Sequence, residues 1–313
     1  MLCKNIGVNQ SGHLTFAGVD TTVLAKTYQT PLYLMDEDQI RENCRLYKSA
    51  MQAHFGPASF PLYASKAASF KRIYEIMRDE EMAIDVVSSG EIATAVKAGF
   101  PMERAFFHGN NKTDADIAFA MDHGLGCFVV DNADELLALD QEAGRRGIRQ
   151  NILLRLTPGI DPHTYEAVAT GKVDSKFGVA IETGQAEQFV RQALSCSHLH
   201  LLGYHCHVGS QVFDEDGTVY HEASKIMLSF AADMRARFGA ELQVLNLGGG
   251  YGVRYTQDDP TVDIAGNITQ LAAEIRSVCQ TLQLPMPAVL LEPGRSIVAD
   301  AGMTLYTAGS TKS

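Results

Sequence analysis

A lysine at the end of a buried strand is the first candidate for chemistry in the sequence. Lys66 closes the apolar run 61–66. Burying an ammonium group is costly, so such a lysine must either reach water or take part in chemistry. A lysine shielded from water loses its proton more readily and can form a Schiff base. Residues two apart share one face of a strand, so we expect Lys66 beside the small Ala64. The alternative is a surface lysine at a strand end.

Three consecutive glycines follow another strand-like run. Gly248, Gly249 and Gly250 come directly after the segment 243–247. Bare amide groups in such a loop can converge on a phosphate. The pattern is not the dinucleotide-binding G-x-G-x-x-G fingerprint, because Val253 stands where the last glycine is required. The other reading is a tight turn that uses positive φ angles. Both readings stay open at the level of sequence.

Two histidines two positions apart end a further run. His205 and His207 should lie on one side of a strand. They could form half of a metal site, for which His108 and Asp131 are loose additional candidates. Alternatively, one ring stacks on a flat ligand while the other makes local hydrogen bonds. Two ordinary core histidines are the third possibility.

A carboxylate and a guanidinium close the last apolar run. In Glu292-Pro-Gly-Arg295, proline and glycine turn the chain away from the sheet and leave both charges at the rim. One possibility is an ion pair between them, worth about 0.2–1 kcal/mol. The other is that Glu292 meets a cationic ligand atom and Arg295 an anionic one.

The elements that must position these groups form a regular alternation. Eight short, continuous apolar runs are typical of strands buried on both faces. Segments with helical patterns separate them, and this alternation predicts a parallel sheet. Eight such units in about 250 residues predict a TIM (β/α)8 barrel, whose functional groups sit at the carboxyl ends of the strands. The expected strands are 61–66, 82–88, 104–109, 127–132, 151–156, 201–207, 243–249 and 288–294, and the expected helices are 70–80, 91–98, 114–123, 133–146, 185–195, 219–238 and 268–282.

Local signals support the expected helix ends. The pairs Ser88/Glu91 and Asn132/Glu135 have the spacing of capping boxes directly after strands. Three glycines also stand where a helix commonly ends in a left-handed residue, at positions 99, 124 and 147.

Composition excludes several classes of protein. The 313 residues are 46% apolar and carry a net charge of −11, so disorder and binding to nucleic acid are both disfavoured. No apolar run reaches the roughly 18 residues of a membrane helix, and the first residues lack a signal-peptide pattern. The six cysteines are scattered, which favours free thiols in a reducing compartment. We therefore expect a cytoplasmic protein.

Taken together, six motifs resemble the fold-type III pyridoxal-phosphate decarboxylases, a family with the alanine racemase/ornithine decarboxylase type of barrel. The motifs are Y-A-S-K at 63–66, D-V-V-S-S-G-E at 85–91, T-G-x-x-x-S-K-F-G at 170–178, H-C-H-V-G-S-Q at 205–211, L-G-G-G-Y-G at 247–252 and E-P-G-R-S at 292–296. The third and fourth favour the diaminopimelate branch over the ornithine branch. The sequence departs from the family at Ala68, where asparagine is usual, and at Ser89, where a glycine is usual.

The resemblance implies a role for each matching residue. Lys66 would carry pyridoxal phosphate and His207 would stack on its ring. Ser210, the three glycines Gly248, Gly249 and Gly250, and Arg295 would hold the phosphate, and Arg295 would also bind a substrate carboxylate. Glu292 would pair with the pyridine nitrogen, whereas related alanine racemases place an arginine there, so Glu292 favours decarboxylation. Asp85 and Arg155 would line the other edge of the cofactor.

The expected reaction is decarboxylation of meso-diaminopimelate to L-lysine and CO2, the last step of lysine synthesis. The alternatives are a decarboxylase of another basic amino acid, of the ornithine or arginine type, a metal-dependent hydrolase that uses His205 and His207, and a barrel without catalytic activity. We expect a small amino-acid substrate, no nucleic acid or membrane partner, and a homodimer when the chain is full length.

The resemblance also predicts a domain division. Residues 1–30 would belong to a β domain, 31–300 would form the cofactor-binding barrel, and 301–313 would begin the connection to a C-terminal β domain. We expect most of that domain to be missing from the 313 residues. We accordingly expect a truncated chain that binds the cofactor weakly, has little activity alone and exposes an apolar surface.

Overall fold

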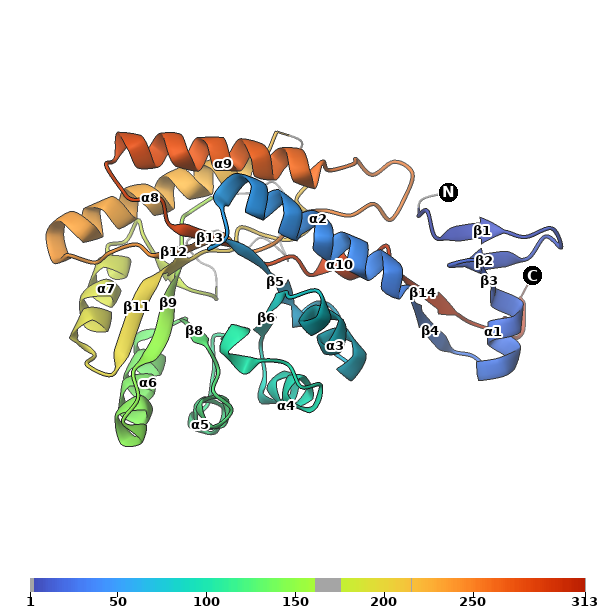
Figure 1. Ribbon diagram of the computed structural model, residues 1–313, viewed down its shortest axis with the longest axis horizontal. Coiled ribbons are helices and arrows are strands. Elements are labelled where there is room, and N and C mark those ends of the chain that lie inside the picture. The colour runs from blue at the N-terminus through green and yellow to red at the C-terminus, as the bar shows by residue number, and fades with distance from the viewer. Residues whose placement is uncertain (1–2, 161–175, 215, 313) are drawn as a thin grey trace.

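Eight parallel strands close into a barrel in the computed structural model, which describes residues 3–160, 176–214 and 216–312 (Figure 1). Around the barrel the order is β9-β11-β12-β13-β5-β6-β7-β8, and β8 pairs with β9 to close it. The strands are β5 (Phe60–Ala64), β6 (Ala83–Val86), β7 (Ala105–Phe107), β8 (Cys127–Val130), β9 (Gln150–Thr157), β11 (Leu199–His205), β12 (Val244–Asn246) and β13 (Ala288–Leu291). All eight predicted strands and the TIM-barrel fold are confirmed.

Helices surround the barrel, as the alternation predicted (Figure 1). On α3, Ile73, Ile76 and Met77 are buried at helical spacing, which shows how one apolar stripe attaches a helix to the sheet. The surrounding helices are α3 (Lys71–Asp79), α4 (Ser89–Lys97), α5 (Asp114–Asp122), α6 (Ala133–Arg146), α7 (Gln185–Ser195), α8 (Thr218–Phe238) and α9 (Ile264–Thr281).

The predicted helix caps are present with one difference. Ser88 and Asn132 each accept a hydrogen bond from the backbone N–H three residues on. The carboxylates of Glu91 and Glu135, however, accept from the N–H of the residue before each cap. The glycines at 99, 124 and 147 all have positive φ, as expected for helix ends.

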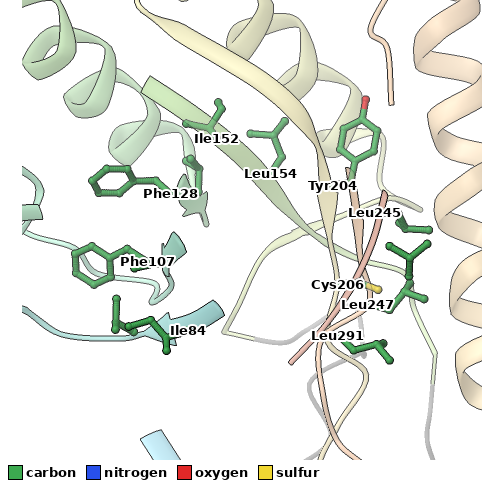
Figure 2. Close-up of a cluster of buried hydrophobic side chains, with 14 of the residues drawn as sticks. Ile84, Phe107, Phe128, Ile152, Leu154, Tyr204, Cys206, Leu245, Leu247 and Leu291 are labelled. Atoms are coloured by element: carbon green, nitrogen blue, oxygen red, sulfur yellow. The ribbon is translucent and has the colours of Figure 1, made fainter. Parts of the chain in front are cut away.

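Two apolar layers lie on opposite sides of the barrel wall. Inside the barrel, a small cluster includes Leu62, Phe106, Leu153 and Leu290. A larger core fills the space between the strands and the helices, and Figure 2 shows part of it. Its labelled members are Ile84, Phe107, Phe128, Ile152, Leu154, Tyr204, Cys206, Leu245, Leu247 and Leu291.

A second, smaller group of elements lies at one end of the molecule, beside the barrel (Figure 1). It contains an antiparallel sheet of β1 (Ile6–Val8), β2 (Leu14–Phe16) and β3 (Val19–Asp20), followed by α1 (Thr21–Tyr28). Next to it β4 (Leu32–Met35) pairs antiparallel with β14 (Gly302–Leu305). The long α2 (Glu37–Phe55) leads from β4 into the barrel and packs against α9.

Short elements complete the fold. They are η1 (Ser65–Ala67), η2 (Met102–Arg104), β10 (Val179–Ala180), which pairs with the end of β9, and α10 (Arg295–Val298). All six cysteines are free thiols, in agreement with the expectation from their spacing. Within the described ranges no helix combines the length and apolar character needed to cross a bilayer.

Candidate functional site

A pocket of about 540 Å³ opens at the carboxyl ends of the barrel strands, a size usual for small-molecule sites. Seven of the ten residues to which the resemblance gave a role line it: Lys66, His207, Ser210, Gly249, Gly250, Glu292 and Arg295. The other three, Asp85, Arg155 and Gly248, are not among its lining residues. The structure thus brings together in one pocket residues from four separate sequence motifs.

Lys66 lies two residues beyond the end of its strand, whereas the strand pattern predicted it as the last strand residue. β5 ends at Ala64, and Lys66 belongs to the 3-10 turn η1 that follows. The residue is exposed, but it lines the pocket together with Ala64 and Ala67. It makes no hydrogen bond or ion pair with any residue that the structure describes, so its amine is available to a ligand.

Glu292 is almost completely buried, with 5% of its surface exposed, at the base of the pocket. Its Oε1 accepts a hydrogen bond of 2.7 Å from Asn246 and lies 2.9 Å from His108 Nε2. Its Oε2 lies 3.2 Å from His205 Nε2. Burial opposes ionisation, but His108 and His205 outweigh it and hold the pKa of Glu292 well below its ordinary value.

His205 and His207 are not arranged as the metal-site alternative requires. A group of side chains with metal-ligating atoms within 4.8 Å of one another consists of His108, His205 and Glu292. His207 does not belong to it; its Nδ1 instead accepts a hydrogen bond from the Gly249 amide. The structure therefore gives no support to the alternative in which His205 and His207 form half of a metal site, because the chain leaves the strand at His205 and His207 contacts the glycine loop.

The glycine loop has no room for side chains. Gly248 and Gly250 have φ angles of +71° and +121°, which favour glycine. A Cβ on Gly249 would lie 2.1 Å from the carbonyl oxygen of Glu292. The tight-turn reading is thus sufficient to explain all three glycines.

Two amides of this loop are already used within the protein. The Gly248 N–H donates to Asn246 Oδ1 at 2.9 Å and the Gly249 N–H donates to His207 Nδ1 at 3.3 Å. Any anion bound here must therefore depend mainly on other groups, and Gly250 is the glycine best placed to contribute.

Arg295 does not pair with Glu292, so the first of the two possibilities, a rim ion pair, is not the one observed. Arg295 Nη1 donates to Tyr255 Oη at 2.7 Å and Nη2 to Ser210 Oγ at 3.3 Å. Its Nε is buried and has no hydrogen-bond partner among the described residues. The turn through Pro293 and Gly294 separates the two charges, and Arg295 begins α10 on the pocket wall.

A layer of buried polar groups lies near the pocket. Asp85 is buried at the end of β6, which raises its pKa. Arg155 on β9 stacks over the Phe177 ring at 4.4 Å, and burial lowers its pKa. Burial, with the nearby charges of Lys66 and Arg155, also lowers the pKa of His207 well below its ordinary value, so this ring is neutral at pH 7.

Sequence reasoning missed several members of the site. His108 was considered only as a loose metal candidate, and neither Asn246 nor Tyr255 was singled out. The only available signal was their position, since His108 follows β7 and Asn246 ends β12. The motif at 170–178 lies mostly outside the described residues; Lys176, Phe177 and Gly178 are its described part.

Comparison with known proteins places the chain. Residues 37–299 match the family described as pyridoxal-dependent decarboxylase, pyridoxal binding domain. The chain belongs to this family. It is 42% identical over 305 residues to the diaminopimelate decarboxylase of Bacillus methanolicus, covering 97% of this chain and 70% of that protein. With the Bacillus subtilis (strain 168) enzyme of the same name it shares 42% identity over 304 residues, covering 97% and 69%.

Two solved structures of proteins named diaminopimelate decarboxylase have the same fold as this chain. The diaminopimelate decarboxylase of M. jannaschii in co-complex with L-lysine superposes with a TM-score of 0.85 at 31% identity, covering 97% of this chain and 70% of that one. The Helicobacter pylori diaminopimelate decarboxylase complexed with L-lysine gives 0.81 at 32% identity, covering 91% and 68%.

Proposed function

We propose that the chain is a pyridoxal-phosphate-dependent decarboxylase that converts meso-diaminopimelate to L-lysine and CO2. One observation carries this proposal: a single pocket contains the amine of Lys66, the carboxylate of Glu292 and the guanidinium of Arg295. The relatives named diaminopimelate decarboxylase and the two lysine-bound structures support the choice of substrate.

The residues present fit this cofactor. Arg295 has a buried Nε without a partner among the described residues, next to the Ser210 hydroxyl, and this suits a phosphate. A Cβ on Gly250 would lie 2.4 Å from the Gly209 carbonyl oxygen, so only glycine lets this loop pass so close to the segment that carries Ser210. Lys66 presents the free amine that the aldehyde requires.

Each residue then has a defined task. Pyridoxal phosphate, when bound, supplies an electron sink for the negative charge left at Cα when CO2 departs. Lys66 would hold the aldehyde carbon, and the neutral His207 would pack against the ring. Ser210, Gly250 and Arg295 would hold the phosphate, and Glu292 would keep a proton on the pyridine nitrogen. Asp85 and Arg155 would set the charge near the opposite edge of the cofactor.

Spectroscopy and peptide mapping test the proposal. Incubation with pyridoxal phosphate should give a visible absorption band, and borohydride reduction should fix the label on Lys66. Lys66→Ala should lose both, while Lys71→Ala, which changes an exposed lysine five residues on, should keep both. Absence of the band and label from the unchanged chain would overturn the proposal. Release of L-lysine from meso-diaminopimelate, but not of an amine from ornithine or arginine, would identify the substrate.

The assembly and the location of the chain are also part of the proposal. A homodimer, the division at residues 30 and 300, and a cytoplasmic location follow from the family resemblance and from the six free thiols. Sedimentation of the purified chain tests the first of these.

A further inference from the structure

Three nitrogen atoms from three different strands surround the buried Glu292 carboxylate. Asn246 Nδ2 belongs to β12, His205 Nε2 to β11, and His108 Nε2 to the residue after β7. Their distances to the nearest carboxylate oxygen are 2.7, 3.2 and 2.9 Å. All of these side chains are less than 6% exposed, so water competes little for the carboxylate.

We propose that His108 and His205 are positioning residues, which hold the Glu292 carboxylate ionised and oriented so that it keeps the pyridine nitrogen protonated. The inference rests on the proposed function. Neither histidine lines the pocket, so each acts through Glu292 rather than on the cofactor.

We call the three side chains around the Glu292 carboxylate (Asn246, His108 and His205) the clamp. Electrostatics explains why Glu292 needs them. A buried carboxylic acid tends to stay neutral, and a neutral group cannot stabilise a proton on a pyridine ring. Nitrogen–hydrogen groups that point at the carboxylate favour its ionised form. Asn246 donates a hydrogen bond to Oε1, and His205 Nε2 is hydrogen-bonded to Oε2. His108 Nε2 lies 2.9 Å from Oε1 as an ion-pair contact without hydrogen-bond geometry. A carboxylate oxygen has two lone pairs, which leaves Oε2 with acceptor capacity for a ligand.

The two imidazole rings also brace each other. Their centroids lie 4.9 Å apart at an interplanar angle of 71°, an edge-to-face contact. Burial lowers the pKa of His205 to about 4, so the ring is neutral near pH 7. A neutral ring that donates from Nε2 leaves Nδ1 as an acceptor, and His205 Nδ1 has no partner among the described residues. The same His108 Nε2 also lies 3.9 Å from Asp85 Oδ1.

Asn246 extends the clamp to the glycine loop. Its amide nitrogen donates to Glu292, while its carbonyl oxygen accepts from the Gly248 amide. One side chain therefore links the carboxylate that faces the pyridine nitrogen to the loop at the phosphate end.

The protonation of the bound cofactor provides the test. Protein loaded with pyridoxal phosphate labelled with 15N in its ring is studied by NMR, because the 15N chemical shift differs between protonated and unprotonated nitrogen. The variants are His205→Leu and His108→Leu, with His205→Gln as the conservative change, since the glutamine amide nitrogen can occupy the place of Nε2. His200→Leu, at the opposite end of β11, is the matched control.

We expect a protonated nitrogen in the unchanged chain, in His205→Gln and in His200→Leu. Both leucine variants at the clamp should show an unprotonated nitrogen and bind the cofactor at least about tenfold more weakly. If either does not fold, the corresponding asparagine variant replaces it, because an asparagine amide is too short to reach Glu292. A protonated nitrogen in the clamp variants would overturn the inference and leave the proposed function intact. Failure of the unchanged chain to bind the cofactor or to label Lys66 would overturn both.

Discussion

The backbone at Glu292, just after β13, passes so close to Gly249 that no side chain larger than hydrogen fits there. We predict that Gly249→Ala lowers the free energy of unfolding by about 3 kcal/mol, because the added Cβ would meet the Glu292 carbonyl oxygen at 2.1 Å. Gly124→Ala is the matched control. Its φ is +69° and nothing lies within 4 Å of the added Cβ, so it should cost only about 1–2 kcal/mol. Urea denaturation of both variants measures the difference, and equal losses would contradict the packing argument.

His205 should make stability depend on pH. The folded protein holds its pKa near 4, whereas an unfolded histidine titrates near 6.5. Between these values the unfolded chain binds a proton that the folded chain does not. Stability is therefore lost as pH falls through this window, by up to about 3 kcal/mol. Denaturation of the cofactor-free protein from pH 7.5 to 4 should show a steeper loss than in His205→Gln. If the unchanged protein and His205→Gln lose stability in parallel as pH falls, His205 is not the cause of the pH dependence.

At the scale of the elements, a buried ion pair joins two neighbouring βα units. Lys112, in the loop after β7, donates to Glu135 at the start of α6 at 2.7 Å. The same ammonium also donates to the carbonyl oxygens of Gly109 and Val129, which ties the loop to β8. The side chains of Lys112 and Glu135 are only 1% and 3% exposed. The pair therefore fixes the loop after β7 against β8 and α6 at the mouth of the barrel.

We predict that Lys112→Met lowers the free energy of unfolding by about 3–5 kcal/mol, because it leaves the Glu135 carboxylate buried without its cation. Adding Glu135→Gln should restore part of this loss, since an amide carries no charge to bury. Lys48→Met removes a partly exposed lysine paired with Glu81 and should cost under about 1 kcal/mol. Chemical denaturation distinguishes these cases, and a loss in Lys112→Met no larger than in Lys48→Met would refute the assignment.

For the whole molecule, exposed apolar side chains are concentrated outside the barrel. More than half of the large ones in the described residues lie in the segment 8–35 or at Tyr306, which directly follows β14. The elements of this segment lie at one end of Figure 1. Large exposed apolar patches promote association. We predict that the chain self-associates with rising concentration, as the sequence analysis expected of an exposed apolar surface.

The double variant Val23→Ser/Tyr33→Ser should shift this association to several-fold higher concentration, because these side chains are 55% and 78% exposed. Leu137→Ser, 53% exposed on α6 of the barrel, is the control and should change little. Light scattering over a concentration series measures the effect. If the double variant and Leu137→Ser shift the concentration of association equally, the association does not depend on the segment 8–35.

The sequence, read with its family resemblance, was enough to predict the barrel and seven of the residues that line its pocket. Strand runs such as 82–88 and helix ends such as Gly99 are determined by residues close together in the chain, so their pattern is readable without a structure. The partners of those pocket residues were decided only by the tertiary structure. Barrel closure and strand register bring His108 and Asn246 to Glu292, and the loop after β12 brings Tyr255 to Arg295. Residues distant in sequence carry no local signal of their contact, because the contact exists only once the strands have closed.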